Sequence, residues 1–342
     1  MIKKTKRVTL TQIAEKVGVS IGVVSIVLNG RTDSVIGVSK EVAQKIKDVA
    51  AKLNYRPNAA ARMMVTQQTK LIGVIIPNKP GREGQSPMSY ETILGIEDGL
   101  QSLGYVLVLV RMHDLMAEKE VQSRVFSEDT LDGVIVIDAM SDGEVDWINS
   151  HFNNTVWCDS NEWSEKGCVR RDEEAVGKLI AEYLIDKGFK KFTIVGSEPP
   201  QCFHYSLIQR REGIEQVAKS AKVKTEFINI YDESEGQLYE NTLLDHIKKD
   251  SAVIAITHPV AEALVLSTSK NALQSGKDFS LISCDDPHAL SWRWENLTRV
   301  SFDRYAMGKT SADMIINQIK NKKHGVSVLQ KGDLIEGSTV IC

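Results

Sequence analysis

Two charged side chains in the second half of the chain, Arg210 and Asp285, are suited to binding a polar ligand. Each lies in or next to a predicted secondary-structure element, which would hold it in place. Arg210 stands in an Arg-Arg-Glu-Gly run inside a predicted helix, and Asp285 directly follows a predicted strand that ends at Ser283-Cys284. A guanidinium fork can bind sugar hydroxyls or a carboxylate, and a carboxylate can accept two hydroxyl hydrogen bonds. Arg210 and Asp285 could instead form interlobe ion pairs that only hold the structure together. The residue types alone favour these ion pairs.

Catalytic chemistry has little support in the sequence. An enzyme built on this chain would have to use Asp285, Asp286 or His258, but we find no nucleophile elbow, phosphate-binding loop or metal-ligand spacing. His258 precedes Pro259 and is either a ligand donor or an ordinary loop histidine. The cysteines lack C-x-x-C spacing and are odd in number, which indicates reduced thiols with no metal role: Cys158, Cys168, Cys202, Cys284 and Cys342. We expect neither an enzyme nor a cofactor.

From Lys70 onward, short apolar runs alternate with amphipathic segments of helix length. The predicted strands are 71–76, 105–110, 134–137, 156–158, 191–195, 226–230, 252–256 and 280–283, and the predicted helices are 90–103, 174–187, 207–219, 238–248 and 259–273. This alternation is typical of repeated βαβ units, whose parallel sheets are covered on both faces. Two such doubly wound halves usually bind a ligand at the carboxyl ends of their strands, often between the halves.

The first part of the chain predicts a small all-α domain instead. A capping box runs from Thr9 to Gln12, Gly18 is expected to end the first helix, and Ser20 is a good N-cap for a second helix. The short turn between the two helices indicates helix-turn-helix geometry, with the second helix as the reader. Ser39 is expected to cap a third helix that closes the core, with Tyr55 packed beneath it. Asn58 can then cap a short helix that is too short to be stable alone.

The charge of the chain is unevenly divided between these two parts. Residues 1–70 hold 13 Lys and Arg against 4 Asp and Glu, a net charge of +9, whereas the whole chain carries −3, which leaves −12 for residues 71–342. A basic head on an acidic body is typical of a nucleic-acid binder. A solvated basic tail gives the same charge and would by itself mean little.

Four runs of residues together resemble the head and hinge of the LacI/GalR family of repressors. They are Val8-Thr-Leu-Thr-Gln-Ile-Ala-Glu-Lys-Val-Gly-Val-Ser, Val24-Ser25, Val27-Leu28-Asn29-Gly30 and Leu53-Asn-Tyr-Arg-Pro-Asn-Ala59. The resemblance implies a small all-α helix-turn-helix domain followed by an α/β two-lobed, doubly wound, periplasmic-binding-protein-like core. It also implies a dimer whose reader helices enter successive major grooves of DNA, while paired hinge helices enter the minor groove between them.

The resemblance assigns DNA contacts to the head and the hinge. The implied residues are Thr9, Ser20, Ile21, Gly22, Val23, Ser25, Ile26, Asn29, Tyr55, Asn58, Arg62 and Met64, with Met64 where the family usually has a wedge leucine. Ile21, Gly22 and Ile26 depart from the family pattern because their side chains cannot hydrogen-bond a base. We therefore expect an AT-rich operator, read through thymine methyl groups and DNA deformability. The loop that begins at Arg31 is longer than usual and either brings Arg31 to a phosphate or is simply solvated.

The resemblance also assigns a small-molecule effector site in the cleft. The implied residues are Ser89, Ser206, Arg210, Tyr231, Asp285 and Trp292. Trp292, Trp294 and Trp163 either offer a sugar-stacking surface or pack the lobe interface. The family's Asn-Asp pair is replaced by Thr257-His258, which weakens any statement about the identity of the ligand.

These expectations combine into a domain plan and a function. We expect a DNA-binding head at 1–57, a hinge helix and linker at 58–70, and an effector-binding and dimerisation domain at 71–342. Its first lobe would cover about 71–161 and 293–325, and its second lobe about 162–290 and 326–342. The expected function is a transcriptional regulator, a repressor, that binds a palindromic double-stranded DNA operator as a homodimer and is switched by a carbohydrate-like effector. No signal peptide or membrane span is visible, which predicts a cytoplasmic, nucleoid-associated protein and disfavours the alternative of a solute-binding protein.

Overall fold

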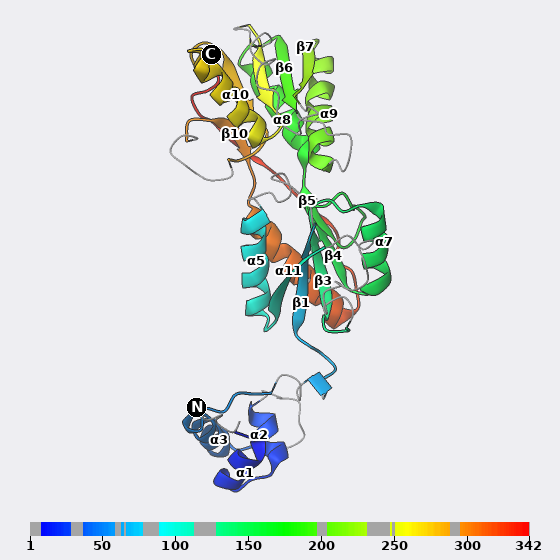
Figure 1. The fold of residues 1–342 in the computed structure, drawn as a ribbon, viewed down its shortest axis with the longest axis vertical. Helices are drawn as coiled ribbons and strands as arrows, with labels where there is room; N and C mark the ends of the chain where they lie inside the picture. Colours follow the sequence, from blue (N-terminus) through cyan, green and yellow to red (C-terminus); the bar gives the residue numbers. More distant parts are fainter. Residues whose placement is uncertain are drawn as a thin grey trace, which may run out of the picture. The chain divides into compact units, whose positions relative to one another are not determined.

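The chain divides into two compact units, Met1–Thr69 and Lys70–Cys342, which are described separately (Figure 1). A computed structural model describes residues 8–28, 37–58, 63–64, 66–77, 89–112, 128–196, 204–230, 247, 250–287 and 295–341. The statements below concern these residues.

The first unit contains the predicted helices α1 (Leu10–Val17), α2 (Ile21–Leu28) and α3 (Lys40–Lys52). The capping box at the start of α1 is present, because the Gln12 amide donates to the Thr9 hydroxyl over 3.4 Å and the Thr9 amide donates to the Gln12 side chain over 3.1 Å. Gly18 ends α1 with φ 84°, a left-handed conformation that glycine adopts without strain. The axes of α1 and α2 then differ by 108°. Local sequence signals alone thus produce the helix-turn-helix.

One small hydrophobic core holds these helices together. Ile13 from α1, Val24 from α2 and Ile46 from α3 are fully buried in it. Tyr55 packs against the same core in a partly buried position, as predicted. Each helix therefore contributes one face to the core and leaves its other face outside.

The second unit contains two sheets of six strands each. The first sheet has the order β11-β5-β4-β3-β1-β2, from strands β1 (Leu71–Ile76), β2 (Val106–Arg111), β3 (Gly133–Ile137), β4 (Thr155–Cys158), β5 (Cys168–Arg171) and β11 (Val328–Gln330). The second has the order β12-β10-β9-β8-β6-β7, from β6 (Lys191–Gly196), β7 (Lys224–Asn229), β8 (Ala252–Ala255), β9 (Ser280–Ser283), β10 (Thr298–Ser301) and β12 (Asp333–Ile335). All pairs are parallel except β10 with β12.

Helices cover both faces of each sheet (Figure 1). The first sheet packs against α5 (Ser89–Ser102) and α11 (Arg304–Asn321) on one face and α7 (Asp142–His151) on the other. The second packs against α8 (Glu173–Asp186) and α9 (Tyr205–Ser220) on one face and α10 (His258–Lys270) on the other. Because both faces are buried, the central strands carry apolar side chains on both sides, which is why they appear as short apolar runs in the sequence.

The chain crosses between the two lobes later than the sequence predicted. We expected the second lobe to begin at about 162, but β5 still belongs to the first sheet, so the crossing follows Arg171. The expected return near 293 is also too early, because β10 belongs to the second sheet and the return follows Phe302. Likewise β11 lies in the first sheet beyond the expected boundary at 325. These strands have only three or four residues, and each includes polar or charged residues, so they lack the apolar signal on which the prediction relied.

Among the described residues, no single helix is both long and apolar enough to cross a membrane; α1 and α2 reach that length only as a strongly bent pair.

Helices α5 and α11 approach so closely that their backbones are in contact at Gly308, and a substitution there tests how they pack. A Cβ atom on Gly308 would lie 2.1 Å from the Thr92 carbonyl oxygen, which leaves no room for a methyl group. We expect Gly308→Ala to lower the free energy of unfolding by about 2–3 kcal/mol, since overpacking forces the helices apart. Urea unfolding followed by circular dichroism measures it. The control is Gly143→Ala in α7, where nothing lies within 4 Å; equal stability of the two variants would contradict the contact.

Candidate functional site

The carboxylate of Asp285 joins three arginine side chains at the carboxyl ends of the strands. It follows β9 in the second lobe, and its Oδ2 accepts from Arg210 Nη2 over 3.0 Å and from Arg171 Nη1 over 3.3 Å. Its Oδ1 accepts from Arg304 Nη2 over 2.5 Å. Arg171 ends β5 and Arg304 begins α11, so both belong to the first lobe and lie where the chain crosses. One carboxylate therefore ties two of the three lobe crossings to the second lobe; the third lies between β11 and β12.

Arg210 is fully buried in the second lobe, and its guanidinium is held from several sides. Glu173, the first residue of α8, accepts from Arg210 Nε over 2.6 Å and from Nη2 over 2.8 Å. The Ile256 carbonyl oxygen after β8 accepts from Nη1 over 2.6 Å. This arrangement is the ion-pair alternative that the residue types favoured, although Arg210 and Asp285 lie in the same lobe. Asp285 makes its interlobe pairs with Arg171 and Arg304 instead.

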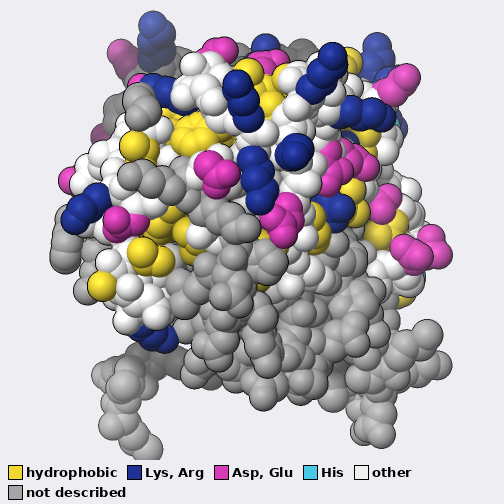
Figure 2. Space-filling view, turned by 90° about the horizontal axis from the view of Figure 1, so that it is seen from above, with side chains coloured by type: hydrophobic (Ala, Val, Ile, Leu, Met, Phe, Trp, Pro, Cys, Tyr) yellow, Lys and Arg dark blue, Asp and Glu magenta, His cyan; other side chains and the backbone are white. Residues whose placement is uncertain are grey.

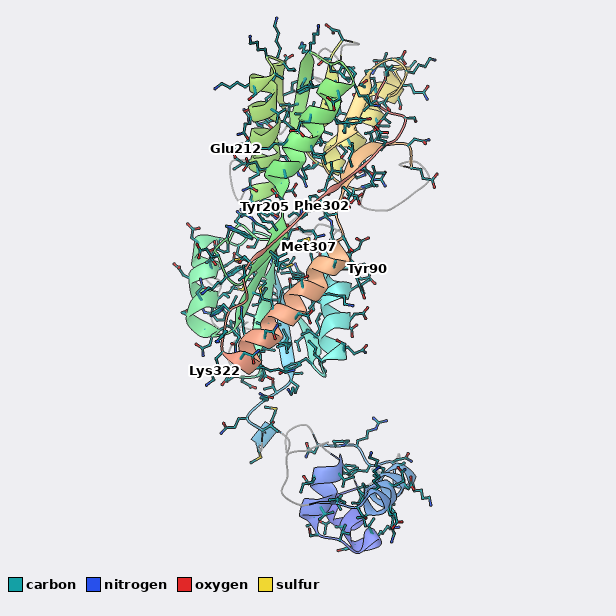
Figure 3. The ribbon with its side chains drawn as sticks, turned by 180° about the vertical axis from the view of Figure 1, so that it is seen from behind. Tyr90, Tyr205, Glu212, Phe302, Met307 and Lys322 are labelled. Atoms are coloured by element: carbon teal, nitrogen blue, oxygen red, sulfur yellow. The ribbon has the colours of Figure 1, made fainter. Side chains whose placement is uncertain are left out.

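Asp159, directly after β4 in the first lobe, binds residues at the start of the second lobe. It accepts from the Tyr205 hydroxyl over 2.7 Å and from Arg171 Nε over 3.1 Å, and its carbonyl oxygen lies 2.8 Å from His204 Nε2. The neighbouring Asn161 side chain accepts from the Tyr205 amide over 2.8 Å. Asp159 has φ 52°, a left-handed conformation that aspartate tolerates at a local cost in energy. Figure 3 shows Tyr205 and Phe302 at this junction between the lobes.

These contacts set the protonation of the cluster. Burial would raise the pKa of Asp285, but Arg304, Arg210 and Arg171 outweigh it and hold that pKa well below the usual carboxyl range. Burial likewise opposes ionisation of Asp159, and Arg171 is the foremost of the groups that hold its pKa well below that range. Asp159 and Asp285 are therefore charged at neutral pH, and their contacts with the arginines are ion pairs.

The other residues predicted for the cleft include some that the structure describes and some that it does not. Ser206 is buried and lies 2.8 Å from His204 Nδ1, and Ser89 is the first residue of α5. His258 is buried at the start of α10, with Nε2 3.3 Å from the Glu262 carboxylate, which favours a structural role. Trp163 stacks on Arg170 with 4.3 Å between guanidinium carbon and ring centroid. Tyr231, Trp292 and Trp294 lie outside the described residues.

Several residues of the cluster were not predicted from the sequence. They are Asp159, Arg171, Glu173, His204, Tyr205 and Arg304. One signal was available, because a Cys-Asp pair stands at the end of a buried strand in each lobe: Cys158 ends β4 and is followed by Asp159, and Cys284-Asp285 comes directly after β9. Burial raises the pKa of both Cys158 and Cys284 to about 12, which keeps them as neutral thiols.

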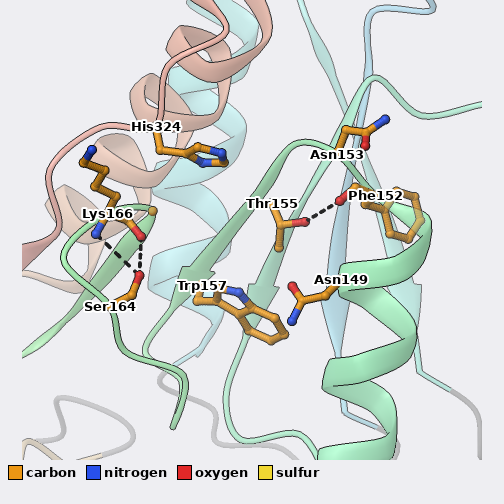
Figure 4. A pocket seen from close by; sticks show the side chains of 9 residues that line it. Asn149, Phe152, Asn153, Thr155, Trp157, Ser164, Lys166 and His324 are labelled. Carbon is orange, nitrogen blue, oxygen red and sulfur yellow. Dashed lines mark hydrogen bonds between the residues drawn. The ribbon is translucent and has the colours of Figure 1, made fainter.

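A separate pocket lies at the opposite, amino ends of β4 and β5 (Figure 4). Its lining residues are Asn149, Phe152, Asn153, Thr155, Trp157, Ser164, Lys166, Gly167 and His324. Two of its hydroxyls are already used, because Thr155 donates to the Phe152 carbonyl oxygen and Ser164 donates to that of Lys166. Within the described part of the chain, no group of three His, Cys, Asp or Glu residues is placed to hold a metal ion.

The predicted DNA-contacting residues of the head lie on or beside α2. Ser20 caps this helix, its hydroxyl accepting from the Val23 amide over 3.4 Å. Ile21 is 48% exposed and Gly22 is exposed, while Val23, Ser25 and Ile26 are half-buried. Thr9 and Asn58 are exposed and Tyr55 is half-buried. Met64 is 86% exposed, and Asn29 and Arg62 lie outside the described residues.

Charges of both signs are mixed on the described part of one face. Figure 2 shows Lys and Arg interspersed with Asp and Glu, with hydrophobic side chains between them, on the part of this face that is not drawn in grey.

Each of the two units matches the model of a known protein family. Residues 9–58 match the model of bacterial regulatory proteins of the lacI family, and residues 181–340 match a periplasmic binding protein-like domain. The HTH-type transcriptional regulator RegA of Clostridium saccharobutylicum is 27% identical over 92% of this chain and 93% of its own length. Catabolite control protein A of Staphylococcus xylosus is 33% identical over 56% of each chain.

Solved structures share the fold. The Lac repressor dimer bound to operator and the anti-inducer ONPF has a TM-score of 0.76 at 20% identity, covering 98% of this chain and 100% of that chain. A complex of the transcriptional regulator CelR with cellobiose has a TM-score of 0.65 at 19% identity, covering 97% of this chain and 100% of that chain.

The chain has a helix-turn-helix head and a two-lobed α/β core, and the curated relatives that it matches are transcriptional regulators rather than enzymes. The chain belongs to the LacI family of bacterial regulatory proteins, as its sequence resemblance predicted.

The depressed pKa values predict an acid-dependent stability. Because Asp159 and Asp285 bind protons more weakly in the folded than in the unfolded protein, their stabilisation is full above about pH 4 and falls as the pH drops toward the depressed pKa values. We expect Asp285→Asn to lower the free energy of unfolding at pH 7 by about 3 kcal/mol, since it leaves buried arginines undercompensated. The free energy of unfolding of this variant should also fall less steeply than that of the parent protein as the pH is lowered.

Urea titrations between neutral pH and about pH 3 measure both effects. Asp313→Asn is the matched control, because Asp313 is exposed on α11. If the pH dependence of Asp285→Asn runs parallel to that of the parent protein, the ion network does not set the acid stability.

Proposed function

We propose that this regulator binds a palindromic DNA operator as a homodimer and changes its operator affinity when a sugar or sugar derivative binds between its lobes. The observation that carries the proposal is the Asp285 cluster, because it ties the crossings after Arg171 and after Phe302 to the second lobe. A ligand that changes these contacts changes the angle between the lobes. The cytoplasmic, nucleoid-associated location belongs to the same proposal.

The proposed effector contacts are those expected in the cleft. They are Ser89, Ser206, Arg210, Tyr231, Asp285 and Trp292. Arg210 and Asp285 support the assignment because they meet at the carboxyl ends of the strands, where ligands of doubly wound sheets bind. The solved relative that holds cellobiose makes a sugar-like effector a reasonable class. Ligand binding then acts by population shift, favouring one lobe arrangement over another.

The proposed DNA contacts use α2 and the hinge. Ile21 supports an apolar reading of thymine methyl groups, because this large side chain is exposed at the start of the reader helix. Met64 supports insertion between base steps, because it is the most exposed of the large hydrophobic side chains described. The remaining proposed contacts are Thr9, Ser20, Gly22, Val23, Ser25, Ile26, Asn29, Tyr55, Asn58 and Arg62.

The proposed dimer surface lies on α5 and β2 of the first lobe. Tyr90 and Leu94 on α5 and Val106 and Leu109 on β2 are exposed hydrophobic residues. Among the described strands, β2 lies at the edge of its sheet and pairs with β1 alone. An exposed apolar patch beside an open strand edge is typical of a protein–protein contact.

Operator affinity measured with and without small molecules tests the regulatory proposal. In fluorescence-anisotropy titrations of the full-length protein on its operator, we expect one sugar or sugar derivative to change the affinity by about tenfold or more. Asp285→Asn should reduce that response, because it removes the group that joins the lobes. If no member of a broad panel changes operator affinity, only the DNA-binding half of the proposal stands.

Sedimentation velocity tests the dimer surface. Leu109→Lys should shift the protein toward monomer and weaken operator binding by about tenfold, because a charge would be buried between subunits. Leu329→Lys is the matched control, since Leu329 is an exposed hydrophobic residue on β11, the opposite edge strand of the same sheet. Unchanged association of Leu109→Lys would place the dimer contact elsewhere.

A further inference from the structure

Two arginines at the lobe junction hold buried donors that have no hydrogen-bond partner among the described residues. Arg304 is 3% exposed and uses Nη2 for Asp285, but its Nε and Nη1 are buried without a partner. The Nε of Arg170 is in the same condition. An unsatisfied donor on a buried cation is costly, and native structures normally keep one only where a ligand, ion or water completes it.

The carboxylates of the described cluster are already shared among other donors. Asp285 accepts from three arginines, and Glu173 accepts from Arg210 and lies 2.6 Å from Arg171 Nη1. Asp159 accepts from Arg171 and from the Tyr205 hydroxyl. No described carboxylate oxygen therefore satisfies the two free donors of Arg304.

The charge of the cluster is also unbalanced. Four arginines, Arg170, Arg171, Arg210 and Arg304, stand against three carboxylates, Asp159, Glu173 and Asp285. Arg170 makes no ion pair among the described residues; it stacks between Trp163 at 4.3 Å and Tyr205 at 4.6 Å. Phe302 lies within 5.3 Å of the Arg171 guanidinium and 5.8 Å of that of Arg304. Aromatic faces tolerate these cations but do not neutralise them.

We propose that the effector carries an oxyanion, a carboxylate or a phosphate, and that Arg304 binds it along one edge of its guanidinium, through Nη2 and one of the two free donors, Nε or Nη1. The inference rests on the proposed effector site and narrows its ligand to an acidic or phosphorylated small molecule. Nη2 lies beside Nε on one edge of a guanidinium and beside Nη1 on another, and either edge is a fork that matches two oxygens of such a group, as Arg210 shows with Nε and Nη2 on Glu173. Arg304 also begins α11, an 18-residue helix whose N-terminus favours negative charge.

The same contact gives the ligand a means of acting on the lobes. Asp285 and the ligand oxyanion would share one guanidinium, and a stronger contact to the ligand draws Arg304 away from Asp285. Arg304 is the point where α11 of the first lobe is tied to the second lobe. Binding would therefore change the crossing at Phe302 and Arg304, where the return to the first lobe takes place.

The test compares charged and neutral probes on the full-length protein by titration calorimetry at constant ionic strength. The probes are D-glucose, D-glucuronate, D-glucose 6-phosphate and inorganic phosphate. We expect an acidic probe to bind about tenfold or more tightly than D-glucose, because a charge-assisted bidentate contact is stronger than one to a hydroxyl. Glucuronate and glucose 6-phosphate separate the carboxylate from the phosphate, and inorganic phosphate shows whether the oxyanion alone suffices.

Variants at Arg304 assign the binding. Arg304→Gln should lose the preference for the acidic probe, and Arg304→Lys should keep part of it, since a lysine retains charge without the fork. Asp285 keeps Arg171 and Arg210 in both variants, and matched melting curves confirm that each one folds. Lys309→Gln is the control, because it removes an exposed cation from the same helix; it should leave binding unchanged.

Three results would overturn the inference: equal affinity for glucose and the acidic probes, an acidic preference that survives Arg304→Gln, or no binding of any acidic probe up to about 10 mM. A neutral sugar that binds and changes operator affinity would overturn the oxyanion while leaving the proposed regulation intact. An acidic probe that binds through Arg304 without changing operator affinity supports the oxyanion and counts against the regulation.

Discussion

The sharing of one carboxylate, Asp285, among three guanidinium groups is the interaction on which the core depends. Its partners come from α9, from the end of β5 and from the start of α11, so a single side chain relates two sheets that otherwise have separate cores. The hydrophobic clusters explain why each lobe folds, but they do not set the angle between the lobes. Directional ion pairs at the crossings do so, because hydrogen bonds to a guanidinium lose strength quickly as their geometry changes.

Buried ion pairs are a poor source of stability, since removing charges from water costs about as much as their attraction returns. Their value here lies in position. Arg171 ends β5 and Arg304 begins α11, each next to a crossing. Asp159 accepts a hydrogen bond from Tyr205, the first residue of α9. A small change in any of these contacts is passed to a strand or a helix rather than absorbed by a loop. This suits a regulator, in which ligand binding must bias one arrangement of rigid lobes over another.

The sequence predicted the parts of the fold that local signals determine. Thr9, Gly18 and Ser39 set the ends of head helices, and apolar runs located the central strands of both sheets. It misplaced the crossings because β5 has two arginines in four residues and offers no apolar pattern. It found Arg210 and Asp285 but missed Arg171 and Arg304, whose importance arises from partners 114 and 19 residues away along the chain. Such pairing is a property of the folded topology and leaves no local periodicity.

The central claim is that the Asp285 carboxylate holds the lobe crossings in place. Amide hydrogen exchange of the full-length protein at peptide resolution tests it most directly, by comparing the parent with Asp285→Asn. The account predicts exchange about tenfold or more faster in the peptides that span 169–174 and 300–306, with β1 unchanged, because loss of the carboxylate frees the crossings while each lobe keeps its core. Equal exchange at the crossings in both proteins would contradict the claim.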